Sequence, residues 1–140
     1  MQVLKTIIFI VLSCAIQVAN AQIIFEKTYG NSQEERGEGL VQLSDSSYVI
    51  VGSTSSFGDL STNLLLLKTD SLGNPIWTKI FGGNNVDAGM EIIKTSDGNL
   101  AMVGYTNSTG AGGYDVYFIK TDVHGKVIVN NFQTANPKLF

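Results

Sequence analysis

Acid–base chemistry in this 140-residue chain would have to come from its carboxylates. A glycosidase, for example, needs two carboxyl groups about 5–10 Å apart across one sugar-sized cleft. The acids lie instead at repeated turn positions, where a side-chain oxygen that accepts hydrogen bonds from backbone N–H groups is the expected role. We expect this turn role above all for Asp45, Asp70, Asp97 and Asp122. The full set of candidates is Glu34, Glu35, Asp45, Asp59, Asp70, Asp87, Asp97, Asp115 and Asp122.

Nucleophilic and metal chemistry have few residues to work with. His124 is the only histidine and Cys14 the only cysteine, so a Ser-His-Asp or Cys-His site has no complete set of members. Zinc needs three or four ligands, most often Cys or His. Calcium is left open at Asp70, which stands near a glycine turn, although the EF-hand spacing is absent. We assign no catalytic, cofactor-binding or metal residue and predict no cofactor.

Glycine clusters and basic residues also favour structural roles. Gly82-Gly83 and Gly110–Gly113 do not lie between a strand and a helix, and no P-loop lysine follows them, so they do not predict a phosphate site. Lys68 and Lys120 follow apolar runs and are expected to extend along a sheet edge with the charge in solvent. The net charge is −3 and no basic cluster occurs, which excludes nucleic acid as the expected partner.

The first 21 residues are typical of a secretory signal peptide. A single cation, Lys5, precedes the apolar run 6–15, and small residues stand at Ala19 and Ala21. We predict cleavage between Ala21 and Gln22. The apolar run is too short to span a bilayer, which takes about 20 residues, so no transmembrane segment is expected in the mature chain.

Cys14 allows a second interpretation of this segment. Val11-Leu-Ser-Cys14 loosely resembles a bacterial lipoprotein box, in which the cysteine carries the lipid anchor. The residues after it continue the apolar run instead of turning to a polar tether. We therefore expect a secreted or cell-surface protein, with a lipoprotein anchored at Cys14 as the alternative.

The rest of the chain is an internal repeat with an offset of 52 residues. Lys68-Thr-Asp70 returns as Lys120-Thr-Asp122, and Phe25-Glu-Lys-Thr-Tyr-Gly30 returns as Trp77-Thr-Lys-Ile-Phe-Gly82. A period near 50 residues indicates a propeller blade or a related array. We divide the chain into a signal peptide (1–21), a first repeat (22–76), a second repeat (77–128) and a partial third strand or tail (129–140).

Each repeat predicts four short strands and no helix, because its apolar runs are rich in β-branched and aromatic residues and end at Gly, Ser, Asn or Asp. The runs 64–67 and 116–119 are continuously apolar, which predicts strands covered on both faces. The predicted fold is all-β, with two four-stranded antiparallel meanders that resemble propeller blades. The expected strands are 23–29, 38–43, 47–53, 64–69, 76–81, 90–95, 99–105 and 115–121.

The repeat pattern resembles that of secreted β-propeller repeat proteins of the Bacteroidetes. The shared features are the aromatic-x-Lys-x-aromatic-Gly segment, Ser-Asp, Val-Gly-x-Thr and Lys-Thr-Asp-x-x-Gly, and they cover residues 25 to about 129. Phe25 and Val129 stand where the family has Trp, and Asn31 replaces a glycine. Only two copies are present, whereas propellers close with about four to eight blades.

The resemblance implies a secreted, non-catalytic repeat protein for surface binding, adhesion or scaffolding. The expected partner is an extracellular glycan or surface protein. Two copies leave outer faces bare, which predicts self-association through exposed blade faces or a fragment of a longer protein. The alternatives are the remnant of a carbohydrate-active or other hydrolytic propeller, and a compact sandwich of two sheets packed face to face.

Overall fold

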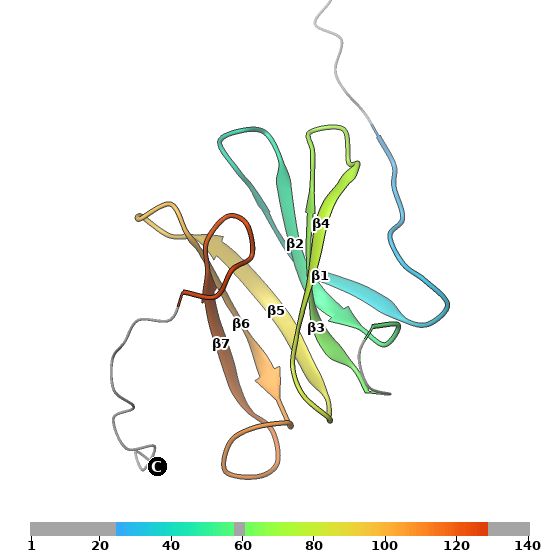
Figure 1. Cartoon of the computed structure of the whole chain (residues 1–140), viewed down its shortest axis with the longest axis vertical. Helices are drawn as coiled ribbons and strands as arrows, with labels where there is room; N and C mark the ends of the chain where they lie inside the picture. Colours follow the sequence, from blue (N-terminus) through green and yellow to red (C-terminus); the bar gives the residue numbers. More distant parts are fainter. Residues whose placement is uncertain (1–24, 58–60, 129–140) are drawn as a thin grey trace, which may run out of the picture.

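A computed structural model describes residues 25–57 and 61–128, which form two antiparallel sheets (Figure 1). The N-terminal sheet has the strand order β1-β2-β3-β4 and the C-terminal sheet the order β5-β6-β7. The described residues contain no helix, so the predicted all-β antiparallel fold is confirmed. The strands are β1 (Glu35–Gln42), β2 (Tyr48–Thr54), β3 (Asn63–Thr69), β4 (Pro75–Phe81), β5 (Asp87–Lys94), β6 (Leu100–Thr106) and β7 (Asp115–Thr121).

Some sequence predictions fall outside the described residues. These are the signal peptide with its cleavage site at Ala21 and Gln22, the lipoprotein cysteine Cys14, the candidate acid Asp59 and the tail 129–140. Within residues 25–57 and 61–128, no helix has the length and apolar character needed to cross a membrane.

The sheets do not follow the repeat boundary drawn from the sequence. β4 carries the opening residues of the second repeat, yet it pairs with β3 and completes the N-terminal sheet. Residues 25–29, predicted as a strand, have an extended course without strand pairing. The C-terminal sheet has three strands in the described part of the chain, and only an isolated bridge between Thr121 and Val127 begins a fourth.

The same irregularity occurs in both sheets at equivalent positions. The β1–β2 register shifts between Gly37 and Gly39, and the β5–β6 register shifts between Gly89 and Glu91. Bulges of this kind increase the local twist of a strand. The 52-residue repeat is therefore a repeat of backbone geometry as well as of residue type.

One hydrophobic core lies between the two sheets. It combines residues of the β1–β2 turn, β2 and β3 with residues of β5, β6 and β7: Leu43, Val49, Val51, Leu64, Leu66, Ile92, Leu100, Met102 and Ile119. All seven residues of β3 are buried, which confirms the prediction of a strand covered on both faces. The same prediction is wrong for β7, where Val116 and Phe118 are exposed. Among the described residues, β7 has one neighbouring strand instead of two, and none of them covers its outer face.

Tight turns join the first two strands of each sheet. The turn before β6 uses Gly98, with φ of 81°, and the turn before β2 places Ser46 at φ of 64°. Only glycine adopts this left-handed conformation at little cost. The first turn therefore has the same form as the second, but with a less suitable residue.

Candidate functional site

The four turn aspartates hold hairpin backbones, as predicted. Asp45 accepts a hydrogen bond from the backbone N–H of Ser47 at 3.0 Å. Asp70 accepts from Leu72 and Asn74 N–H groups, both at 2.8 Å. Asp122 accepts from the N–H groups of His124 and Lys126, both at 2.9 Å, and Asp97 from Asn99 at 3.3 Å.

Two of these aspartates also hold the repeated lysines. Lys120 Nζ lies 2.6 Å from Asp97 Oδ2, and Lys68 Nζ lies 3.5 Å from Asp45 Oδ2. The two pairs are equivalent under the 52-residue offset. One pair links β3 to the β1–β2 turn, and the other links β7 to the β5–β6 turn. The two lysines therefore have the same structural role in the two repeats.

The Asp97 cluster predicts an acid-dependent stability. Lys120, Thr95 and Asn99 donate hydrogen bonds to this carboxylate and hold its pKa well below the ordinary 3.8. A carboxyl group whose pKa is lowered by folding stabilises the fold above its unfolded pKa, and this contribution is lost as the pH falls. We expect the thermal unfolding midpoint to fall as the pH is lowered below about 4. Asp97→Asn is expected to make this pH dependence of the midpoint less steep.

The control for this experiment is Glu91→Gln, which removes an exposed carboxylate of β5. Midpoints followed by circular dichroism between about pH 2 and 7 give the comparison. An acid response in Asp97→Asn as steep as in the Glu91→Gln variant would contradict the prediction.

Glu35 and Asp87 occupy equivalent positions and close equivalent loops. Glu35 accepts hydrogen bonds from Asn31 N–H at 3.1 Å and Thr54 Oγ1 at 3.0 Å. Asp87 accepts from Gly83 N–H at 2.8 Å and Ser108 Oγ at 2.6 Å. Asp87 is fully buried. These acids are used to fold the loops 30–35 and 82–87.

The remaining sequence candidates also have structural surroundings. Asp115 Oδ2 accepts the Ala111 N–H at 3.0 Å, so the glycine stretch 110–113 wraps a carboxylate of its own chain. His124 lies in an exposed turn. In the residues that the structure describes, no three His, Cys, Asp or Glu side chains form a group that could hold a metal ion.

The loops of both repeats meet in a polar groove of about 540 Å³, here called the loop groove. Ser55 and Ser56 follow β2, whereas Asn84 and Asn85 belong to the loop before β5. Asn85 is fixed by its N–H to Ser108 Oγ at 3.0 Å and its amide to Asn107 O at 3.0 Å. The lining offers hydroxyl and amide groups and no carboxylate: Gln33, Ser55, Ser56, Ser61, Thr62, Asn84, Asn85, Val86 and Asn107.

A second hollow, of about 220 Å³, brings two carboxylates to one surface. Glu34 and Glu38 both line it, together with Arg36 and Tyr105. The Arg36 guanidinium lies 2.6 Å from Glu34 Oε1, and this ion pair is largely exposed. Glu38 was not among the candidates that the sequence singled out.

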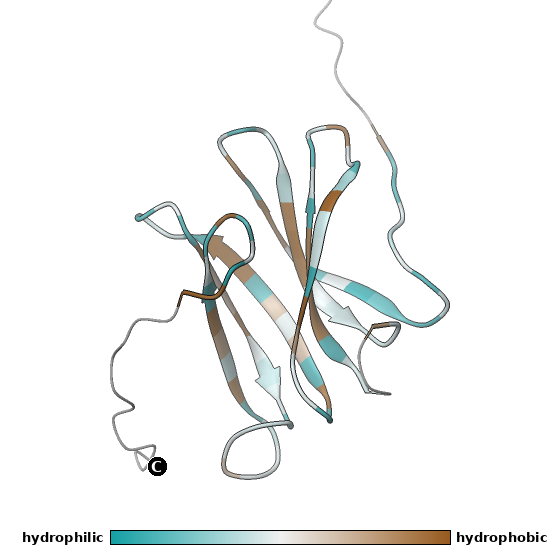
Figure 2. Cartoon of the chain, in the orientation of Figure 1, coloured by the Kyte–Doolittle hydropathy of each residue, from teal (hydrophilic) through white to brown (hydrophobic). Residues whose placement is uncertain are grey.

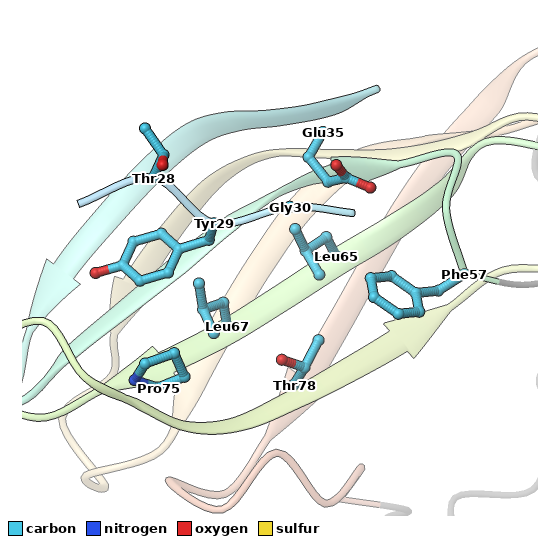
Figure 3. Close-up of a pocket in the computed structure, with 9 residues that line it drawn as sticks. All are labelled: Thr28, Tyr29, Gly30, Glu35, Phe57, Leu65, Leu67, Pro75 and Thr78. Carbon is cyan, nitrogen blue, oxygen red and sulfur yellow. The ribbon is translucent and has the colours of Figure 1, made fainter. Parts of the chain in front are cut away.

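A third hollow, of about 290 Å³, is apolar and lies between the segment 25–30 and the N-terminal sheet. Figure 3 shows Tyr29 and Phe57 on opposite sides of it, with Leu65 and Leu67 of β3 between them. Tyr29 donates its hydroxyl hydrogen to Gly73 O at 2.7 Å, which fixes the segment over the β3–β4 turn. Burial, with Asp70 nearby, raises the pKa of the Tyr29 hydroxyl.

Sequence reasoning missed the loop groove because its lining residues come from four loops, which precede β1, join β2 to β3, precede β5 and follow β6. Their Ser, Thr, Asn and Gln side chains have the ordinary composition of loops, so only their meeting in space distinguishes them.

No protein-family model matches the chain, and no curated protein was found to be similar to it.

Proposed function

We propose that this chain is a secreted, non-catalytic repeat protein of the β-propeller type that binds extracellular glycans through the loop groove. The observation that carries the proposal is the groove's lining of hydroxyl and amide groups from both repeats. Such groups suit the neutral hydroxyls of a sugar, and the volume falls within the range of small-ligand sites, about 300–1,000 Å³. Surface binding, adhesion or scaffolding are the roles that follow.

Three further features support parts of this proposal. The composition of residues 1–21 supports secretion. The stacked antiparallel sheets at a 52-residue period support a propeller-type array, as does the resemblance to Bacteroidetes repeat proteins. The engagement of Asp45, Asp70, Asp97 and Asp122 in turn hydrogen bonds supports a binding role over a hydrolytic one.

The test is a screen of immobilised neutral oligosaccharides, followed by calorimetric titration of the best sugar. Asn84→Ala and Gln33→Ala remove amides that line the groove, and each is expected to weaken binding about ten-fold, the loss of roughly one good hydrogen bond. Gln42→Ala, an exposed amide on β1 that does not line the groove, is the matched control. Binding unaffected by both groove variants would contradict the proposal.

Hydrolysis is the second candidate, favoured by Glu34 and Glu38 on one hollow. Two carboxylates on one surface are the minimum for glycoside hydrolysis. Sugar turnover by the intact chain that disappears in both Glu34→Gln and Glu38→Gln would replace the binding proposal with this one. Turnover that survives either change would exclude this pair.

A further inference from the structure

No described residue covers the outer face of the C-terminal sheet, although the equivalent face of the N-terminal sheet belongs to the core. Leu64 and Leu66 of β3 are fully buried, whereas their equivalents Val116 and Phe118 of β7 are 78% and 66% exposed. These residues hold the same places in the same repeat. The difference arises because the C-terminal sheet covers β3, while no described residue covers β7. Figure 2 shows hydrophobic residues along β7 at the margin of the molecule.

The outer face of the N-terminal sheet has the shape that receives such a surface. The equivalent face of the C-terminal sheet is the one that packs against β2 and β3. There, an added Cβ at Gly89 would overlap a methyl group of Val51 and lie 3.0 Å from Leu64 Cγ. At the equivalent Gly37, the nearest atom is Ile50 Cγ2 at 3.4 Å, and the position is exposed.

A leucine on the same face repeats this contrast. Leu40 is 59% exposed, whereas its equivalent Ile92 is 5% exposed and belongs to the core. The outer face of the C-terminal sheet therefore presents the exposed apolar side chains Val116 and Phe118. The outer face of the N-terminal sheet presents Gly37 and Leu40, whose equivalents Gly89 and Ile92 pack against such side chains inside the chain. The outer face of β7 is open in the described structure, and so is the part of the N-terminal sheet's outer face around Gly37 and Leu40, whereas its β3 part is covered by residues 25–30.

The segment 25–30 lies where the fourth strand of a preceding sheet would lie. An added Cβ on Gly73 would meet the Phe25 ring, as one on Gly125 would meet the Trp77 ring of β4. Residues 25–30 thus sit against the N-terminal sheet as β4 sits against the C-terminal sheet. They make no backbone–backbone hydrogen bond with any described residue. In Figure 1 this segment runs alongside the N-terminal sheet, on the side away from β7.

The free edge of β7 is the edge that such a strand would complete. In the N-terminal sheet the equivalent edge of β3 pairs with β4, with Leu66 opposite Lys79. Between Asp115 and Ile119, β7 has no strand neighbour other than β6 in the described residues. Unpaired strand edges add extended segments by backbone hydrogen bonding.

We propose that the protein associates head to tail with a second copy of itself. The outer face of the C-terminal sheet of one copy packs on the outer face of the N-terminal sheet of the next. Residues 25–30 of that next copy pair with β7 as its fourth strand, with Lys27 opposite Phe118. The two contacts form together, because β4 and the inter-sheet core already make the same pair of contacts inside each chain.

The sequence favours a second copy over the chain's own tail as the added strand. The aromatic-x-Lys-x-aromatic-Gly pattern of β4 is present in residues 25–30 and absent from residues 129–134. A head-to-tail contact is heterologous, so it closes into a ring or continues as a filament. The proposal stands on the repeat geometry alone and is independent of glycan binding.

The first test uses the full chain and Gly37→Ala. Light scattering after size exclusion is expected to show an assembly whose mass is a multiple of the chain mass and which dissociates on dilution. The alanine methyl has room in the single chain, but in the assembly it would overlap Val103 of the neighbouring copy, the repeat equivalent of Val51. We therefore expect association to weaken at least ten-fold, with an unchanged monomer thermal midpoint. Glu38→Ala, the neighbouring exposed residue on β1, is the control. A wild-type chain that stays monomeric at all concentrations would overturn the proposal, whichever strand completes β7.

The second test traps the register between copies. Two proteins, each with Cys14→Ser, carry Lys27→Cys and Phe118→Cys respectively and are mixed under mild oxidation. Facing residues of antiparallel strands have Cα separations of about 4.5–5.5 Å, which a disulfide can bridge. We expect this pair to crosslink at least ten-fold faster than Glu26→Cys with Phe118→Cys, since Glu26 points to the other face. Equal rates, or faster crosslinking of Phe118→Cys with itself, would overturn the proposed head-to-tail arrangement.

Discussion

Gly104→Ala is expected to destabilise the protein by about 3 kcal/mol or more, at the upper end of overpacking effects. An added Cβ would overlap the carbonyl oxygen of Ala88 and lie 2.8 Å from its carbon. The obstacle is backbone within the β5–β6 bulge, which cannot move aside like a flexible side chain. Equilibrium unfolding in urea measures the loss.

Gly37→Ala is the matched control for this change. It is also a bulge glycine, but an added Cβ there meets only Ile50 Cγ2 at 3.4 Å, an ordinary van der Waals contact. We expect less than about 1 kcal/mol of change for the dilute monomer. The explanation fails if Gly104→Ala unfolds at the same urea concentration as Gly37→Ala. Gly52, the equivalent of Gly104, would overlap Arg36 O and should behave as Gly104 does.

Leu66→Ala is expected to cost about 2–5 kcal/mol, the range for removing a large side chain from a packed core. Leu66 is fully buried on the face of β3 that meets the C-terminal sheet. The mutation removes apolar contacts and leaves a cavity that two sheets braced by each other can only partly close. Unfolding followed by circular dichroism in denaturant gives the free energy.

Two control variants, Leu72→Ala and Phe118→Ala, separate the effect of burial from that of residue type. Leu72 lies in an exposed turn, and Leu72→Ala should change stability by less than about 0.5 kcal/mol. Phe118→Ala, the repeat equivalent of Leu66→Ala, should be nearly neutral in dilute protein. At concentrations where copies associate it should lower the apparent stability, because assembly stabilises the folded state by mass action. A Leu66→Ala effect as small as that of Leu72→Ala would show that the inter-sheet core does not hold the fold.

The turn network was largely predictable from the chain. Asp97 and Asp122 stand two residues before the N–H groups that they accept, so their partners are set by local geometry. The partners of Asp87 were not predictable to the same degree. Its hydrogen bond to Ser108 joins loops 21 residues apart, and these meet only once β5 and β6 have paired.

The sequence by itself determined the all-β class, the 52-residue period, the hairpins and the turn roles of the aspartates. These depend on apolar runs of strand-forming residues, on turn residues and on contacts within a few positions, all of which can be read directly from the chain. The tertiary structure decided that Pro75–Phe81 completes the first sheet instead of opening the second, and that residues 25–30 form no strand pair with the described residues. A repeat has no intrinsic starting point, so its sequence cannot say where one sheet ends. Only the packing of the sheets shows that Leu66 is core while Phe118, in the same place one repeat later, faces solvent.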